Sequence, residues 1–236
     1  MQTKPVLTTL FNNTQKLCKL ELPKSPIGKL RIDTTISKEN PTLFVSKILN
    51  EKNEEIGAEI FDIKNSNTKD MFGYSISIPP QYRGKRLGEL LRLSSIIEMI
   101  ENNVEKIKIY SKNTAIYFHS KYKFKPDFQS FSHRNEALKT VCECKLKDFA
   151  DIKKEAEILL QKIENTETNK TKEQKLLSTE ANKILTKYIN KIIETNNEKQ
   201  LQFDVGFNMS LSRSSVFENK DFFNELFKRH GIDYKI

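Results

Sequence analysis

The sequence predicts an α+β fold, with a mixed, mainly antiparallel sheet, flanking helices and an added helical hairpin. Three observations support this prediction. Short runs of alternating apolar residues follow one another between residues 28 and 78, as strands joined by turns require. Apolar residues then recur at helical spacing over residues 87–100. Two later stretches, 152–163 and 171–192, have the same helical spacing and form the hairpin.

The elements are expected in a simple order along the chain. Four strands at 28–38, 43–49, 56–63 and 72–78 precede a helix near 84–102, a strand ending at Ser111 and a helix over 113–123. Residues 134–145 fit either a helix or a strand. A late strand at 203–209, a helix over 219–230 and a closing strand at 232–236 complete the chain.

The N-terminal stretch gives a weaker pattern. Residues 6–11 fit a short helix or an extended arm, and Pro23 and Pro26 indicate a break before the first strand. We expect a core over residues 1–146, with the hairpin at 147–197 as an insertion in the sheet or a subdomain. Residues 198–236 then supply the closing strands and the C-terminal helix.

Composition limits the classes of function. The 236 residues include 40 basic and 31 acidic ones, a net charge of +9, which suits an acidic ligand, nucleic acid or an anionic membrane face. Lysine is abundant throughout, which favours a diffusely basic surface over a dedicated nucleic-acid patch. Three cysteines cannot build a disulfide framework, so reduced thiols and a cytoplasmic location are expected. We expect no membrane span, because no apolar run has the length of one.

One stretch combines a strand, a tight turn and a helix. The strand ends at Pro79-Pro80, because proline cannot donate to a ladder. A turn with two glycines follows, and it directs backbone N–H groups and the positive end of a helix towards one point. Arg83, Lys85 and Arg86 add positive charge there. This arrangement suits a phosphate group.

The amino-acid sequence of this strand–turn–helix stretch resembles a known signature. Residues 78–88, Ile-Pro-Pro-Gln-Tyr-Arg-Gly-Lys-Arg-Leu-Gly, resemble the acetyl-CoA signature of the GNAT superfamily of acyl-CoA N-acyltransferases. Arg83 and Gly88 match the ends of that pattern, and Arg86 stands where a glycine is usual. The resemblance covers about residues 28–124. It implies acetyl-CoA as co-substrate, bound by Ile76, Ser77, Ile78, Arg83, Gly84, Lys85, Arg86, Leu87, Gly88 and Asn113.

Residues 111–124 resemble the second signature of the same superfamily. Ala115 and Phe124 match it, whereas Lys123 replaces a glycine. His119 falls where the family has a tyrosine that protonates the departing thiolate. A histidine can donate this proton, since its unperturbed pKa is about 6.5. The alternative interpretation of His119 is a histidine on the helix surface.

A base for the acceptor amine is harder to assign. Glu59, on the strand beside the cofactor strand, is the best-placed acid, although an exposed strand glutamate is the better explanation of this residue. Ser75 and Ser77 are candidates for holding a water. His133 and His230 lie in different segments without acidic partners at metal-ligand spacing, so no metal is expected.

The prediction is therefore an acetyl-CoA-dependent N-acetyltransferase with direct transfer to an amine. The acceptor is a protein lysine, an N-terminus, a polyamine, a charged tRNA or a drug. The family places two helices between its first two strands, where they wall the acceptor site, and here only residues 38–41 fill that place. We therefore expect an unusual acceptor side. A protein partner bound through the hairpin is one option. Two alternatives stay open: an inactive GNAT-fold binding protein, and a basic nucleic-acid-binding module.

Overall fold

The computed structural model describes residues 6–9, 16–25, 27–65, 69–112, 115–127, 131–165, 171–195 and 206–236. Its contacts divide the chain into two compact units. Unit 1 comprises the chain up to Lys108 together with Leu211–Ile236, and unit 2 comprises Ile109–Ser210. No helix among the described residues combines the length and the apolar character that a membrane crossing requires.

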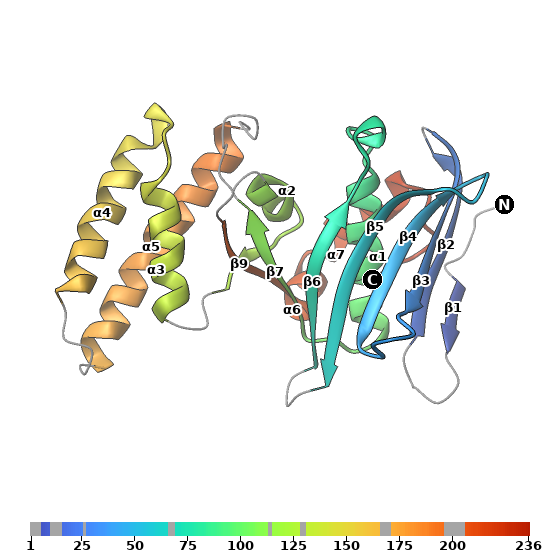
Figure 1. The fold of residues 1–236 in the computed structure, drawn as a ribbon, viewed down its shortest axis with the longest axis horizontal. Coiled ribbons are helices and arrows are strands. Elements are labelled where there is room, and N and C mark those ends of the chain that lie inside the picture. The colour runs from blue at the N-terminus through green and yellow to red at the C-terminus, as the bar shows by residue number, and fades with distance from the viewer. Residues whose placement is uncertain are drawn as a thin grey trace. The chain divides into compact units, whose positions relative to one another are not determined.

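Unit 1 is built on an antiparallel meander whose strands pair in chain order (Figure 1). The strands are β1 (Val6–Thr9), β2 (Lys16–Ser25), β3 (Gly28–Ile36), β4 (Leu43–Asn50), β5 (Glu55–Asn65) and β6 (Lys69–Ser77). The four strands predicted between residues 28 and 78 are confirmed as β3 to β6. The short helix considered for residues 6–11 is wrong, since β1 begins at Val6 and pairs with β2.

β2 continues through Pro23, where the sequence indicated a break. The register between β2 and β3 shifts between Leu22 and Ser25. An irregularity of this kind tolerates proline, because no ladder N–H is needed there.

Helix α1 (Leu87–Glu101) packs against the strands of this meander, and most of its side chains are buried. Strand β7 (Lys106–Lys112) begins beside β6. The N–H of Glu105 donates to the carbonyl of Lys69 at 2.8 Å, and the Lys108 ammonium pairs with the Asp70 carboxylate at 2.7 Å. Because both strands start at one edge, they run in the same direction, with α1 as the crossover between them.

A β-bulge interrupts β6, the strand that leads into the turn before α1. Between Ile60 and Phe61 the register of β5 with β6 slips, so that Tyr74 is an extra residue without a partner opposite. Tyr74 is 61% exposed. The alternating apolar residues 72, 74, 76 and 78 would all face one side of a regular strand, and this expectation is wrong because the bulge shifts the alternation by one residue.

Unit 2 carries the outer part of the sheet and the inserted helices. Strand β8 (Lys125–Pro126) pairs antiparallel with β9 (Gly206–Ser212), and the strand order is β7-β9-β8. Helix α2 (Ile116–Lys121) precedes β8. The helices α3 (Phe131–Cys142), α4 (Ala150–Glu164) and α5 (Thr171–Thr195) lie between these paired strands in the chain and pack on one another (Figure 1). They thus separate, in the chain, two strands that are neighbours in the sheet, and α3 shows that residues 134–142 are helical.

The chain ends in unit 1 with α6 (Arg213–Glu218) and α7 (Lys220–Arg229). The predicted closing strand at 232–236 is wrong, because this segment is not a strand. It is fixed by local hydrogen bonds instead: the N–H of Ile232 donates to the carbonyl of Phe227 at 2.9 Å, and the N–H of Ile236 donates to Asn224 Oδ1 at 2.9 Å. Tyr234 donates its hydroxyl to Glu101 at 2.8 Å.

A buried carboxyl on α1 predicts that stability depends on pH. Glu98 accepts hydrogen bonds from the Cys18 N–H and from Asn102 Nδ2, yet burial raises its pKa from 4.5 to about 7. The folded chain thus binds this proton more tightly than the unfolded chain. We expect the free energy of unfolding to fall by about 2–3 kcal/mol as the pH rises from the unfolded to the folded pKa, and to level off above it. Urea unfolding across this range checks the slope.

The matched variant for this measurement is Glu98→Gln, which keeps an acceptor oxygen but cannot ionise. Its stability should vary less with pH than that of the parent protein over the same interval. Subtracting the two curves removes the contribution of Glu59, whose pKa burial also raises. Parallel curves for parent and variant would rule Glu98 out as the source.

Candidate functional site

The turn between β6 and α1 is compact and held by its own backbone. The N–H of Tyr82 donates to the carbonyl of Pro79 at 2.9 Å, and the N–H of Arg83 donates to the carbonyl of Pro80 at 3.2 Å. The Arg83 side chain returns to the end of the strand, where its Nε donates to the carbonyl of Ile78 at 3.2 Å. Residues 83–86 thus lie in this turn, and Leu87 and Gly88 begin α1.

Two residues of this turn adopt the left-handed conformation that glycine favours. Gly84 has φ = 77° and Arg86 has φ = 61°. For a residue with a side chain, this conformation costs roughly 1–2 kcal/mol. Arg86, which departs from the signature by replacing a glycine, nevertheless keeps the backbone conformation of a glycine.

The first turn of α1 leaves backbone donors available. Arg86 is the N-cap residue, and it makes no side-chain hydrogen bond to the helix end. The first helical hydrogen bond runs from the N–H of Leu90 to the carbonyl of Arg86, at 3.2 Å. The preceding N–H groups of Leu87 and Gly88 have no acceptor within the helix. Together with the helix dipole, these donors suit an anion such as a diphosphate.

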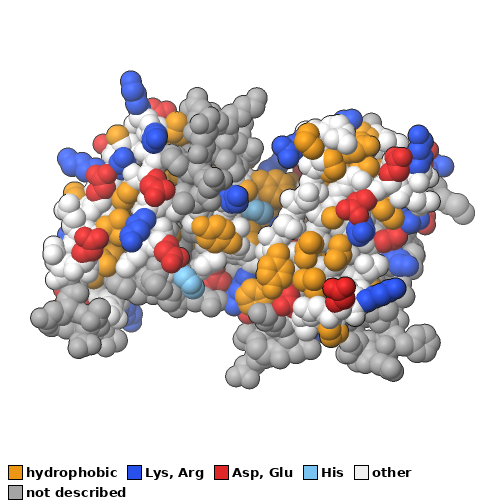
Figure 2. All heavy atoms as spheres, viewed as in Figure 1, with side chains coloured by type: hydrophobic (Ala, Val, Ile, Leu, Met, Phe, Trp, Pro, Cys, Tyr) orange, Lys and Arg blue, Asp and Glu red, His pale blue; other side chains and the backbone are white. Residues whose placement is uncertain are grey.

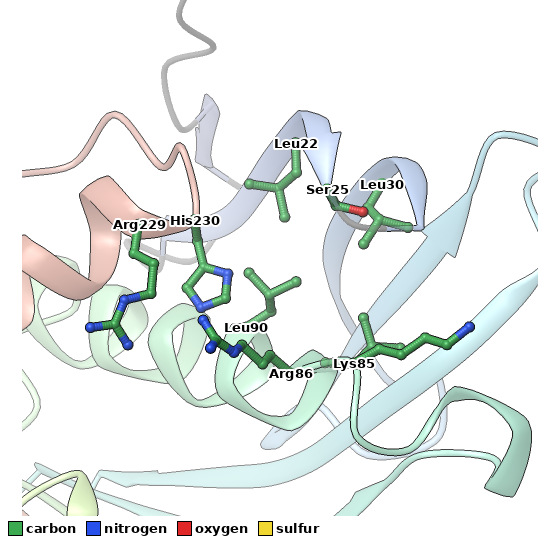
Figure 3. Close-up of a pocket in the computed structure, with 9 residues that line it drawn as sticks. Leu22, Ser25, Leu30, Lys85, Arg86, Leu90, Arg229 and His230 are labelled. Carbon is green, nitrogen blue, oxygen red and sulfur yellow. The ribbon is translucent and has the colours of Figure 1, made fainter.

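The turn also borders a small cavity within unit 1 (Figure 3). The cavity has a volume of about 110 Å³, and its lining includes Lys85 and Arg86 from the turn and Arg229 and His230 from the end of α7. Figure 3 shows Arg86 pointing towards His230 and Lys85 pointing away from it. His230 Nε2 lies 2.8 Å from Glu89 Oε1. The Arg229 guanidinium and the His230 ring at the end of α7 therefore both lie beside the Glu89 carboxylate of the first turn of α1.

Sequence reasoning missed this contribution of α7. It considered His230 only as a metal ligand, and nothing in the sequence connects residues 229–230 with a turn at 83–88. The one available signal is a chemical one: Arg229 and His230 form a basic pair at the end of a predicted helix, directly before Gly231. That pattern is also what an ordinary helix C-terminus shows.

The end of β6 provides the other predicted cofactor contacts. Ile76 and Ile78 are half-buried, whereas Ser77 is exposed. Ser75 is exposed as well, so both serines of this strand are open to water. The carbonyl of Ile78 is occupied by Arg83.

Glu59, the predicted base, lies in the core between β5 and α1. It is 1% exposed, its Oε1 lies 3.0 Å from Nη1 of the 2% exposed Arg92, and it accepts a hydrogen bond from the Ser95 hydroxyl. Burial raises the pKa of Glu59, while Arg92 and Ser95 oppose that rise. The exposed strand glutamate of the alternative interpretation is contradicted by this burial. The same burial argues against direct contact between Glu59 and an acceptor amine.

His119, the predicted acid, lies on α2 in unit 2. It is 9% exposed and packs edge-on against Phe118, with ring centroids 5.2 Å apart, and against Phe124 at 5.6 Å. A histidine on the helix surface does not describe this environment. Lys123, where the signature has a glycine, adopts φ = 66°. Asn113 lies outside the described residues.

The two halves of the predicted site thus fall in different units. The turn and Glu59 belong to unit 1, and His119 belongs to unit 2. Among the described residues there is no group of three or more histidine, cysteine or acidic side chains arranged to hold a metal ion.

Comparison with known proteins gives a likeness of fold only. No protein-family model matches the chain, and no curated protein matches it. Similar solved structures include Tetrahymena GCN5 (19% identity, TM-score 0.35, covering 39% of this chain and 56% of that one). They also include a GNAT-family acetyltransferase from Elizabethkingia anophelis with acetyl-CoA bound (17%, 0.34, 37% and 57%). A third is the spermidine N-acetyltransferase SpeG of Vibrio cholerae (15%, 0.35, 38% and 54%).

In each case the likeness extends over little more than a third of this chain. The chain covers somewhat more than half of the length of each. At such identities and TM-scores the likeness carries no statement about activity. This chain's own structure provides the strand order, the bulge in β6 and the helix end without a side-chain cap, independently of these comparisons.

Proposed function

We propose that this protein is an acetyl-CoA-dependent N-acetyltransferase that transfers an acetyl group directly to an amine. The observation that supports it best is the turn before α1, where an uncapped helix end and two left-handed residues meet at the end of β6. The basic side chains of Arg83, Lys85 and Arg86 surround this point. Backbone N–H groups there suit the diphosphate of coenzyme A.

The proposed reaction needs few side chains. The acceptor nitrogen attacks the thioester carbon, a C–N bond forms and the C–S bond breaks. Backbone N–H groups near residues 76–78 polarise the carbonyl, and His119 protonates the departing thiolate. With Glu59 buried, a water held by Ser75 or Ser77 takes the proton of the amine. Positioning of the two substrates supplies much of the rate.

The alternative of an inactive GNAT-fold binding protein rests on the departures from the signatures at Arg86, His119 and Lys123. Arg86 and Lys123 both keep left-handed conformations, which favours a retained site. Figure 2 shows basic and acidic side chains interspersed over the visible described surface, which counts against a dedicated nucleic-acid patch on this face. The acceptor stays open, whether it is a small molecule, a protein bound through the inserted helices, or a charged tRNA.

Calorimetric titration with acetyl-CoA tests the proposed cofactor site. Gly88→Val should weaken binding about tenfold or more, since a branched side chain on the first helical turn obstructs approach of the diphosphate. Arg86→Gly is the matched control: it keeps the left-handed turn and every backbone N–H and removes one charge, so its affinity should fall less than that of Gly88→Val. Thiol release with a panel of amines then tests transfer. Acetyl-CoA binding without turnover would support the inactive alternative, and no binding would refute the proposed transferase.

A further inference from the structure

The cavity in Figure 3 lies between the turn before α1, strands β2 and β3, and the end of α7. One wall is apolar and consists of leucine side chains from β2, β3 and α1, namely Leu22, Leu30, Leu87 and Leu90. None of the lining residues comes from β6, where the thioester carbonyl is proposed to lie. The proposed acetyl transfer therefore leaves this cavity without a role.

The charged residues that line the cavity are all basic: Lys85, Arg86, Arg229 and His230. No aspartate or glutamate is among the lining residues. Figure 3 shows the Arg86 side chain pointing towards His230, whereas Lys85 points away from it. Two guanidinium groups and an imidazole thus border one small space. A cavity lined by charges of one sign attracts an ion of the opposite sign.

One carboxylate beside the cavity offsets part of this positive charge. Oε1 of Glu89 lies 2.8 Å from Nε2 of His230 and 3.9 Å from Nη1 of Arg229. Arg86 takes part in none of the ion pairs between described residues. The charge of its guanidinium is therefore not balanced on the side of the cavity. The leucine wall strengthens the field of this charge, because apolar groups exclude water.

The volume of the cavity, about 110 Å³, limits the size of the anion. About 10–15 Å³ is enough for a single water molecule, and sites for drug-sized ligands measure about 300–1,000 Å³. A small inorganic oxyanion falls between these limits. Guanidinium groups are well suited to phosphate, because their N–H donors bind its oxygens in pairs. Size and donors therefore both indicate phosphate.

We propose that this cavity binds phosphate, either as the free ion or as the phosphate end of a small ester. The guanidinium groups of Arg86 and Arg229 donate to the phosphate oxygens, with the ring of His230 beside them. The backbone of Arg86 belongs to the turn, and its side chain belongs to this second site. The site is separate from the diphosphate contacts proposed for the backbone N–H groups, and it does not depend on acetyl transfer.

Calorimetric titration of the full chain with inorganic phosphate, in chloride buffer of constant ionic strength, tests the site. Arg86→Gly and Arg229→Gln should each weaken phosphate binding about tenfold, because each loses one charge-assisted contact. Lys228→Gln is the matched control, since it removes an exposed cation of α7 that does not line the cavity, and it should bind phosphate as the parent protein does. No saturable binding to the parent protein, or equal losses in Arg229→Gln and Lys228→Gln, would overturn the proposal.

Gly88→Val separates this site from the helix end. The added side chain obstructs the N–H groups of α1 but lies outside the cavity lining, so phosphate binding should persist. Loss in Gly88→Val with retention in Arg229→Gln would place the anion at the helix end and refute the cavity site. Arg86→Gly suits the left-handed turn and tests the site alone if Arg229→Gln does not fold. Methyl phosphate should bind as tightly as phosphate if the site accepts an ester and more weakly if it takes the free ion, and either result supports the site.

Discussion

Replacing Arg92 by leucine should lower the free energy of unfolding by about 3–5 kcal/mol. Arg92 and Glu59 are almost fully buried, with 3.0 Å between Nη1 and Oε1. Removing the guanidinium leaves the Glu59 carboxylate in the core with only the Ser95 hydroxyl described as its hydrogen-bond donor. Burial already raises the pKa of Glu59 in the presence of Arg92. Urea unfolding at neutral pH measures the loss.

Two further variants separate the burial of a lone charge from the loss of an ion pair. Lys187 forms a pair with Glu155 at 2.7 Å that is exposed on both sides, so Lys187→Leu should cost less than about 1 kcal/mol. The double variant Glu59→Met/Arg92→Met should cost less than the sum of its single changes, since it leaves no buried charge unpaired. If Arg92→Leu costs no more than Lys187→Leu, this account of the core is wrong.

The meander and α1 could be predicted because burial imposes a period on each. Strands β3 and β4 alternate between buried and more exposed residues, and α1 repeats its apolar residues at helical spacing. β2 carries the same signal, since Cys18, Leu20 and Leu22 are buried and alternate with exposed residues. This strand was not predicted, because proline normally ends a strand. In the structure, Pro23 lies at a shift in the register between β2 and β3, where proline is tolerated. The bulge at Tyr74 could not be foreseen, because it depends on pairing with β5.

In the candidate site, too, features set by neighbouring residues could be predicted, whereas features set by residues distant in the sequence could not. The strand, turn and helix at residues 71–101 form a contiguous segment, so their order was readable from the sequence. The conformations of Arg86 and Lys123 were not, because arginine and lysine rarely take positive φ. Glu59 was considered exposed because its partner Arg92 lies on a different element. Pairing across elements also decides the environment of His230, which contacts Glu89.

Replacing His119 by phenylalanine should lower kcat for acetyl transfer by about 10²–10⁴-fold, the usual contribution of a general acid. The replacement keeps an aromatic ring beside Phe118 and Phe124, so the packing of α2 is retained while the proton donor is lost. The affinity for acetyl-CoA should not change, because the proposed diphosphate contacts lie in the turn before α1. Thiol release gives kcat, and calorimetric titration gives the affinity.

Tyr117→Phe is the matched control, since Tyr117 is a half-buried residue of the same helix with an ionisable group of its own. If His119 protonates the thiolate, kcat falls only in the histidine variant. A loss confined to Tyr117→Phe would transfer the role of acid to the tyrosine, and unchanged kcat in both would leave water as the proton source. Equal losses of kcat and of acetyl-CoA affinity in His119→Phe would instead indicate that the ring supports the fold of unit 2. The ratio of the two effects, more than the size of either, therefore decides whether His119 acts on the departing thiolate.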